Sequence, residues 1–227
     1  MTLTLKALGI LLTYPSAELL TAKDEIKTVL KAEGWISKST VRAVERFLDS
    51  AAKKDIYDLQ EDYVALFDRT PSLCLHMFEH VHGDSRDRGQ ALVELDTLYR
   101  EVGLENVSDH TPDYLPLFLE YLSLLSPEQA RENLDGAVDV IAVIGERLKK
   151  RESGYAVIFD GLCEAAARKP DINKIQSALK LNEGHELSQE EMDEAWEQQF
   201  AFDGVKDDNG GGCPKADQML KRMEAGS

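Results

Sequence analysis

The stretch from Ser126 to Leu148, SPEQARENLDGAVDVIAVIGERL, decides the fold class of this chain. Its first four residues form a capping box with Pro127 at the first helical position, which is a strong signal for the start of a helix. Between Val138 and Leu148 apolar side chains fall on nearly every side of that helix. A helix that is apolar almost all round is buried on all sides. We therefore expect it at the centre of a helical bundle, and a break at Asp135-Gly136 is compatible with the same pattern.

Helical spacing of apolar residues also recurs outside this stretch, and no alternating run of β-branched residues indicates a strand. Prolines, glycines and capping residues divide the pattern into segments. The expected helices lie at residues 3–12, 16–34, 37–48, 55–67, from 70 onward, 85–102, 113–125, 126–148, 155–168, 171–181 and from 188 onward. The sequence thus predicts an all-α fold, a single-domain bundle of about ten helices over residues 1–202.

The composition changes after residue 202. Residues 203–227 contain the acidic pair Asp207-Asp208, three successive glycines from Gly210 to Gly212, and mostly polar residues after them. A segment of this kind buries too little apolar surface to offset the entropy lost on ordering it. We expect residues 203–227 to form a disordered, flexible tail.

The chain is strongly acidic, with 42 Asp and Glu against 26 Lys and Arg among 227 residues and a formal net charge of −16. This charge disfavours nucleic acid and anionic membrane surfaces, because contacts to phosphates need basic side chains. A cationic partner such as a basic peptide is favoured instead. The same acidity would also serve simply to keep a cytoplasmic protein soluble, and charge alone does not separate the two interpretations.

Three cysteines at widely separated positions, 74, 163 and 213, include no C-x-x-C pair. This usage argues against a disulfide framework and for a reducing compartment. The first apolar run, residues 8–12, is too short for a signal peptide, and no run approaches the roughly 20 apolar residues that span a bilayer. We expect a soluble, cytoplasmic protein without membrane insertion.

One short motif indicates an enzyme. Residues 76–80, His-Met-Phe-Glu-His, match the H-x-x-E-H pattern in which two histidines bind zinc and a glutamate acts as general base. In the helix expected from Thr70 onward, His76 and His80 would share one face. Catalytic zinc usually has three protein ligands, and the sequence offers no clean third beside this motif. A zinc-dependent hydrolase that uses His76, Glu79 and His80 is therefore the alternative function.

The segment from 113 to 125 predicts a helix with an apolar core face and a second, mixed face. Asp113 is the expected N-cap residue, so Pro116 would occupy the third helical position, where its missing N–H costs nothing. The mixed face combines carboxylates with apolar side chains: Asp113, Leu117, Glu120, Tyr121 and Leu124. Such a face suits a groove that binds an amphipathic helix with basic flanks. A half-exposed helix edge that binds nothing would show the same pattern.

Residues 78–90, FEHVHGDSRDRGQ, resemble the signature of the molybdenum-cofactor assembly chaperones of respiratory nitrate reductases, the NarJ-type family. Residues 63–68 (YVALFD), 112–122 (PDYLPLFLEYL) and 151–160 (RESGYAVIFD) also resemble this family. The resemblance covers most of the chain between Leu3 and Phe200. It places the chain in the wider class of chaperones that mature twin-arginine-exported redox enzymes.

The resemblance implies an all-helical, cytoplasmic and non-catalytic chaperone with no cofactor of its own. Its partner would be the N-terminal peptide of the nitrate reductase catalytic (alpha) subunit, and the molybdenum-cofactor delivery machinery would be a further partner. Such a chaperone holds the apoenzyme open while the molybdopterin guanine dinucleotide cofactor and an iron–sulfur cluster are inserted, and it delays docking on the membrane subunit. It is not a component of the finished enzyme.

The client-binding surface implied by the resemblance comprises ten positions: Tyr63, Phe67, Phe78, Glu79, His80, Arg86, Asp113, Leu117, Glu120 and Tyr121. We expect apolar client residues to pack against Tyr63, Phe67 and Leu117. The carboxylates of Glu79, Asp113 and Glu120 would meet its basic residues. The wider class often has Asp-His where this chain has Asp113-Tyr114, and tyrosine does not titrate near neutral pH. An oligomeric scaffold that binds no such peptide is a third interpretation.

Overall fold

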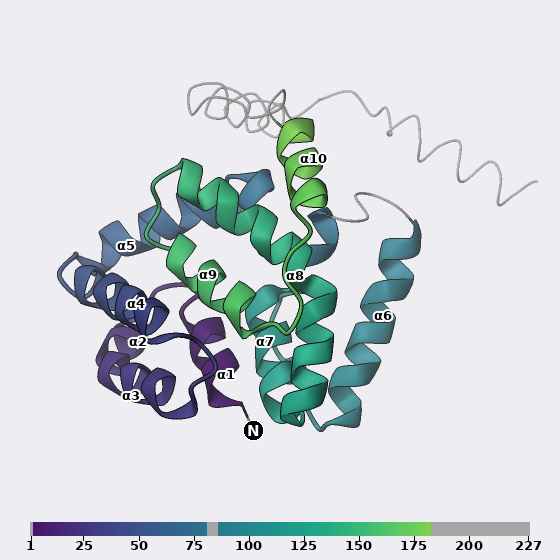
Figure 1. The fold of residues 1–227 in the computed structure, drawn as a ribbon, viewed down its shortest axis with the longest axis horizontal. Coiled ribbons are helices and arrows are strands. Elements are labelled where there is room, and N and C mark those ends of the chain that lie inside the picture. The colour runs from purple at the N-terminus through teal and green to yellow at the C-terminus, as the bar shows by residue number, and fades with distance from the viewer. Residues whose placement is uncertain (1, 81–85, 183–227) are drawn as a thin grey trace, which may run out of the picture. The chain divides into compact units, whose positions relative to one another are not determined.

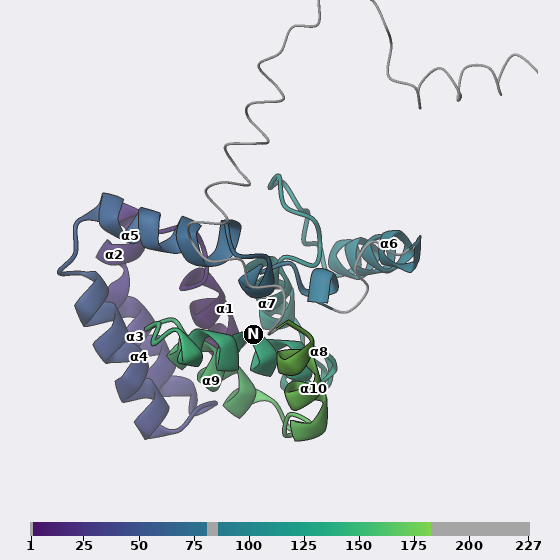
Figure 2. The ribbon, with the colours of Figure 1, turned by 90° about the horizontal axis from the view of Figure 1, so that it is seen from above.

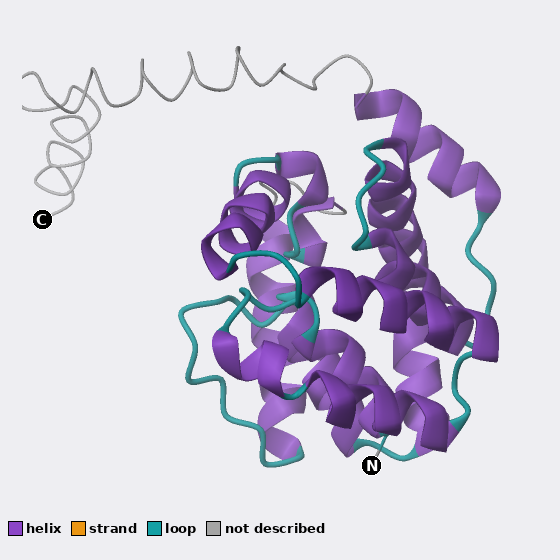
Figure 3. Cartoon of the chain, turned by 90° about the vertical axis from the view of Figure 1, so that its left-hand side faces the viewer, coloured by secondary structure: helices purple, strands orange, loops and turns teal. Residues whose placement is uncertain are grey.

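The computed structural model describes residues 2–80 and 86–182, and these residues are helical with connecting loops (Figures 1 and 3). The α-helices are α1 (Leu3–Ile10), α2 (Ala17–Thr21), α3 (Lys23–Glu33), α4 (Lys38–Ala51), α5 (Ile56–Tyr63), α6 (Arg86–Glu101), α7 (Leu115–Leu124), α8 (Pro127–Lys150), α9 (Ala156–Ala165) and α10 (Ile172–Asn182). Three shorter turns are η1 (Val64–Asp68), η2 (Pro71–Leu73) and η3 (Met77–His80). The all-α prediction is confirmed. The expected helix from 188 onward and the tail at 203–227 lie outside the described residues.

The central helix predicted from its apolar pattern is α8, which contacts α7, α9 and α10. Its capping box forms as expected: the Ser126 hydroxyl accepts from the Gln129 N–H, and the Gln129 side chain accepts from the Ser126 N–H. The helix runs through Asp135-Gly136 without a break. Its Val138, Ile141 and Leu148 side chains are fully buried, which places α8 in the core.

Helices α1 and α7 pack closely side by side and run antiparallel. Near the start of α1, the Thr2 N–H donates to the Ser123 carbonyl at the end of α7 (2.9 Å). Farther along α1, a Cβ on Gly9 would lie 3.0 Å from the Leu119 Cβ and 3.3 Å from the Pro116 carbonyl oxygen. Only glycine therefore allows the two backbones to approach this closely without a shift.

The N-terminal helices are tied to α1 by a side-chain cap. The carboxylate of Glu33, at the end of α3, accepts from the backbone N–H groups of Leu3 (2.9 Å) and Thr4 (2.8 Å). These N–H groups belong to the first turn of α1 and have no intrahelical partner. The helix expected at 16–34 is divided into α2 and α3 at Ala22. The helical spacing of apolar residues continues on both sides of Ala22, so the spacing alone does not reveal this break.

The helix expected from Thr70 onward does not form. Residues 71–80 instead contain two short 3-10 turns and an isolated antiparallel bridge between His76 and Tyr114. The Met77 N–H donates to the Asp113 carbonyl (3.1 Å), and the Leu115 N–H donates to the Leu75 carbonyl (2.9 Å). Because these backbone groups pair with a distant segment, they are not available for helical hydrogen bonds.

Helix α6 lies at the edge of the described helices (Figure 2). Its buried residues Leu95 and Tyr99 anchor it, and the Tyr99 hydroxyl donates to the Pro112 carbonyl (2.7 Å). Gly103, the second residue beyond the end of α6, has a φ of +78°, in agreement with the expected helix end. No helix in the described ranges is both long enough and apolar enough to cross a bilayer.

Candidate functional site

A groove with a volume of about 930 Å³ lies along the crease between α1 and α7, where η1 and two loops close its far end. Helix α1 contributes Lys6 and Ile10, the loop after it contributes Tyr14, and α7 contributes Leu117 and Glu120. The remaining wall comes from the end of α5, from η1 and from the loops around His76 and His110: Tyr63, Phe67, Asp68, His76, His110 and Tyr114. Apolar and aromatic side chains therefore line a hollow that has a few charged groups at its margins.

Aromatic rings pack edge-on or tilted against one another at the far end of the groove. The Tyr63 ring lies 5.7 Å from the Tyr14 ring and 5.0 Å from the Phe67 ring, measured between centroids. The Tyr63 hydroxyl donates to the Leu12 carbonyl (2.9 Å) and lies 3.1 Å from the Tyr114 hydroxyl. Burial raises the pKa of the Tyr63 phenol far above its usual range, so this hydroxyl remains protonated. These contacts fix the rings in place.

The backbone at η1 is a π-helical turn, in which Arg69 N–H donates to the Val64 carbonyl (2.9 Å). Such a turn holds one more residue than an α-helical turn and changes the direction in which the following side chains point. Here it follows α5 directly and carries Phe67 and Asp68, both of which line the groove. Rare turns of this kind are frequent at functional sites.

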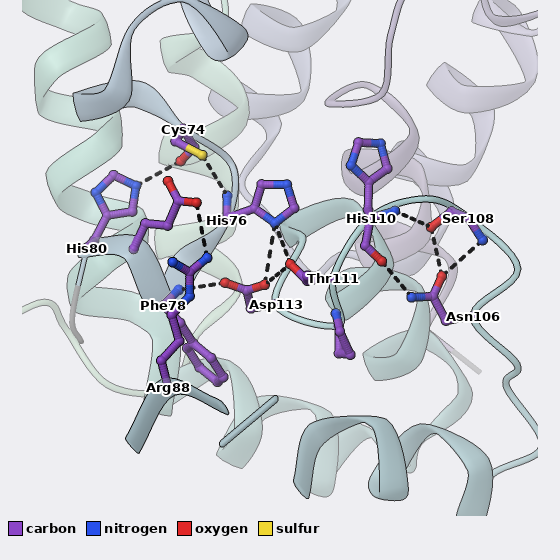
Figure 4. Close-up of polar contacts among 12 residues, drawn as sticks. Cys74, His76, Phe78, His80, Arg88, Asn106, Ser108, His110, Thr111 and Asp113 are labelled. Carbon is purple, nitrogen blue, oxygen red and sulfur yellow. Dashed lines mark hydrogen bonds and ion pairs between the residues drawn. The ribbon is translucent and has the colours of Figure 1, made fainter. Parts of the chain in front are cut away.

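The Asp113 side chain is completely buried. Figure 4 shows its polar contacts with His76, Phe78 and Thr111. Its carboxylate accepts from the Phe78 N–H (3.0 Å) and the Thr111 hydroxyl, and lies 3.4 Å from His76 Nδ1. Burial alone would raise the pKa of this carboxyl, but the hydrogen bonds from His76, Thr111 and Phe78 hold it below its usual value. Asp113 thus fastens the 76–78 segment to the start of α7.

The structure corrects two expectations about Asp113. The residue is not the N-cap of α7, because Tyr114 occupies that position and Pro116 is the second helical residue. A side chain with no exposed surface also cannot meet a client's basic residue directly. Asp113 instead contacts His76, which lines the groove, and so supports the groove indirectly.

The other two carboxylates expected to meet a client already have partners. Glu120 forms an ion pair with Lys6 across the groove (3.0 Å), and both side chains are 41% exposed. Glu79 forms an ion pair with Arg88 of α6 (3.1 Å) and does not line the groove. Exposed ion pairs of this kind contribute little to stability, but they neutralise the carboxylates of Glu79 and Glu120.

The remaining expected site residues lie elsewhere. Tyr121 is buried on the side of α7 that faces α6, with its ring 4.8 Å from the Tyr99 ring. Phe78 packs against the core, and Arg86 begins α6, although its side chain lies outside the described part. Of the ten expected positions, the structure brings Tyr63, Phe67, Leu117 and Glu120 together in the groove.

The two histidines of the H-x-x-E-H motif have separate partners (Figure 4). His76 Nδ1 lies 2.9 Å from the Thr111 hydroxyl, whereas His80 Nε2 donates to the Cys74 carbonyl (2.8 Å). They do not share a helical face, because the expected helix is absent. Among the described residues, no group of three or more His, Cys, Asp or Glu side chains could hold a metal ion. The zinc-hydrolase alternative is not supported.

Protonation of His80 is expected to destabilise the fold. Burial lowers the pKa of this imidazole below its ordinary 6.5, so the folded protein favours the neutral ring. As the pH falls, the unfolded chain binds the proton first, and the stability contributed by the neutral ring is lost below the unfolded pKa. When the pH is lowered from about 7 to about 5.5, the midpoint of thermal unfolding should therefore fall less for His80→Gln than for the wild type. Equal losses in both proteins would contradict this role for His80.

Sequence reasoning missed several groove residues. His110 stacks face to face on Tyr114, with ring centroids 3.8 Å apart and an interplanar angle of 12°. It lies in a loop without periodicity, so nothing local indicates that it reaches the groove. Asp68 follows Tyr63 and Phe67 in the same segment, and its position next to Phe67 could have indicated that it also lines the groove. Ile10 and Tyr14 belong to the first helix and its end, where only the pairing with α7 reveals their role.

Comparison with known proteins places this chain in a family. The family model described as nitrate reductase delta subunit matches residues 36–160. The nitrate reductase molybdenum cofactor assembly chaperone NarJ of Escherichia coli strain K12 is 38% identical over 87% of this chain and 85% of its own length. The chain belongs to the nitrate reductase delta subunit family. NarW of the same strain is 33% identical over 86% of this chain and 81% of NarW.

The fold of this delta subunit family member is also found in a solved structure. A crystal structure described as a redox enzyme maturation protein from Archaeoglobus fulgidus superposes with a TM-score of 0.53, covering 71% of this chain and 91% of that one. At 22% sequence identity this likeness shows the fold alone. NarJ and NarW are named as assembly chaperones rather than as catalytic enzymes, in agreement with the expectation that this chain is not an enzyme.

Proposed function

We propose that this chain is a cytoplasmic assembly chaperone of nitrate reductase. It binds the N-terminal segment of the catalytic alpha subunit in the groove between α1 and α7. By holding that segment it keeps the apoenzyme open for insertion of the molybdenum cofactor and an iron–sulfur cluster, and it delays docking on the membrane subunit. It then leaves and is not a component of the finished enzyme. The machinery that delivers the molybdenum cofactor is a further partner.

The groove is the observation that carries this proposal. Its centre is apolar, because Ile10 of α1 and Leu117 of α7 lie on its walls, and aromatic rings line one end. An amphipathic helix binds such a groove by inserting apolar side chains from one of its faces. The volume of about 930 Å³ is at the upper end of the range of small-molecule pockets and gives room for several side chains. The fixed rings make the groove a preformed receptor, which lowers the entropy lost on binding.

The variant Leu117→Asp tests where the client segment binds. Leu117 is partly exposed on α7, and a carboxylate there would be desolvated by an apolar client side chain. We expect the dissociation constant for a synthetic peptide with the N-terminal sequence of the alpha subunit to rise by about tenfold or more, corresponding to about 1.4 kcal/mol. Isothermal titration calorimetry measures this change directly.

Val93→Asp provides the matched control. Val93 is 62% exposed on α6 and does not line the groove, so this variant changes net charge and exposed apolar surface in the same way. Its affinity for the peptide should equal that of the wild type. Equal affinities for Leu117→Asp and the wild type would rule out the groove, and a wild-type chain that binds no alpha-subunit peptide would rule out the client. Copurification of the catalytic subunit from cells grown anaerobically with nitrate would support the client independently.

A further inference from the structure

The two ends of the groove differ in charge. At one end Lys6 of α1 and Glu120 of α7 neutralise each other across the crease. The opposite end of the groove lies close to the end of α1 and the start of α7. There the Tyr63 hydroxyl is hydrogen-bonded to the Leu12 carbonyl and to the Tyr114 hydroxyl. Asp68 lines the groove and follows Phe67 of the aromatic wall at that far end. The antiparallel packing of α1 and α7 therefore gives the groove one neutral end and one acidic end.

Asp68 differs from the other carboxylates near the groove in having no neutralising partner in the part of the chain that the structure describes. Asp113 is buried and hydrogen-bonded, Glu120 pairs with Lys6, and Glu79 pairs with Arg88. Within residues 2–80 and 86–182, Asp68 makes neither a side-chain hydrogen bond nor an ion pair within 4 Å, although its residue surface is exposed. It is thus available to a ligand that enters the groove.

Tyrosine rings line the groove together with Asp68: Tyr14, Tyr63 and Tyr114. Burial raises the pKa of both the Tyr63 and the Tyr114 phenol, and the charge of Asp68 adds a smaller rise to each. Partial burial raises the pKa of the Asp68 carboxyl itself, and the imidazoles of His110 and His76 oppose that rise. A partly desolvated carboxylate of this kind gains more from a cation than one in open water.

The neighbouring imidazole of His110 does not supply that cation at neutral pH. Burial and the adjacent His76 lower the pKa of His110 below its ordinary value, so the ring stacked on Tyr114 is mainly neutral. The electron-rich faces of exposed tyrosine rings attract cations as well. Tyr14 is 50% exposed and also lines the groove, which adds such a face to its wall.

We propose that Asp68 and the tyrosine rings around it form a subsite for one basic side chain, arginine or lysine, of the peptide that occupies the groove. This inference rests on the proposed function and extends it, because it also sets the direction in which the peptide lies. The basic side chain lies at the Asp68 end, beside the aromatic rings. The apolar anchors of the peptide lie between Ile10 and Leu117, toward the neutral Lys6–Glu120 end. Charge asymmetry thus selects one of two antiparallel ways to fill the groove.

The variant Asp68→Asn in the full chain tests this subsite, because it removes the charge and keeps the shape. Glu61→Gln is the control: Glu61 is exposed on α5, loses one charge in the same way, and does not line the groove. The probes are the N-terminal alpha-subunit peptide and copies in which each arginine or lysine in turn is replaced by citrulline or norleucine. At about 50 mM salt, where exposed charges are screened less, we expect Asp68→Asn to bind the unmodified peptide about tenfold more weakly. Glu61→Gln should bind like the wild type.

The modified peptides identify the basic residue that Asp68 receives. For one of them, the wild type and Asp68→Asn should bind with equal affinity, because the coupled pair has already been broken. Equal weakening by Asp68→Asn and Glu61→Gln would show a general effect of charge and would overturn the subsite while leaving the groove intact. Tight binding by the wild type with no effect of Asp68→Asn would do the same. A wild type that binds no peptide would overturn the proposed function and the subsite together. Unchanged thermal unfolding of both variants shows that each is folded.

Discussion

Asp113→Ala is expected to lower the free energy of unfolding by about 3 kcal/mol, with a fall of roughly 10 °C in the thermal midpoint. The carboxylate of Asp113 has no exposed surface and accepts from the Phe78 N–H and the Thr111 hydroxyl. Removing it takes the acceptor of both hydrogen bonds away from a part-buried site, and a desolvated donor that loses its acceptor costs more than the hydrogen bond itself contributes. It also releases the 76–78 segment from the start of α7. Urea unfolding followed by circular dichroism gives the change in free energy.

Two further variants separate this effect from a general loss of charge. Asp109→Ala removes an exposed carboxylate from the loop before Asp113 and should change stability by no more than about 0.5 kcal/mol. Asp113→Asn keeps one acceptor oxygen and should fall between the wild type and Asp113→Ala. If Asp113→Ala were as stable as Asp109→Ala, the buried carboxylate would not hold the two segments together.

The same glycine-to-alanine substitution should have opposite effects at two positions in α8. A Cβ on Gly145 would lie 2.9 Å from the Phe159 Cβ on α9. That atom is fixed to the α9 backbone, so relief requires the two helices to separate, and overpacking of this kind costs about 3 kcal/mol. The higher helix propensity of alanine than of glycine stabilises the fold by about 1 kcal/mol. We expect Gly145→Ala to lower the free energy of unfolding by about 2 kcal/mol.

Gly136→Ala is the internal control for this prediction. Gly136 is exposed on the same helix, and a Cβ there would meet no atom within 4 Å. Only helix propensity then acts, and the variant should be more stable than the wild type by about 1 kcal/mol. Both changes can be measured by chemical denaturation under one set of conditions. A stabilising Gly145→Ala would show that α8 and α9 are less closely packed than the structure indicates.

Local signals in the sequence located most helix ends. Ser37, Asp55 and Ser126 cap the helices that follow them, and Gly34 has the left-handed conformation expected at a helix end. Each of these features depends on residues within one turn of the chain, so a single sequence contains the information. The all-round apolar pattern of α8 likewise indicated its central place, because only the core accommodates such a helix.

Interactions between distant segments account for the failures. The backbone near His76 pairs with residues around Tyr114, which prevented the expected helix from 70 onward. The same pairing buries Asp113, whose spacing alone had indicated an exposed helix cap. The family resemblance identified Tyr63, Phe67, Leu117 and Glu120 correctly as neighbours, but it did not indicate that Lys6 already neutralises Glu120. Charge pairing across the groove can be known only once α1 and α7 are placed.

The pairing of α1 with α7 has a consequence for synthesis of the protein. The groove draws one wall from the first fourteen residues and the other from residues 108–120, and the Lys6–Glu120 pair spans 114 positions of the chain. During translation the first wall leaves the ribosome long before the second, at roughly 5–20 residues per second. For several seconds the side of α1 that packs on α7 therefore has no partner, although α3 has already been made. A nascent chain stalled before α7 cannot form the groove, so the proposed client site is complete only after more than half of the chain has been made.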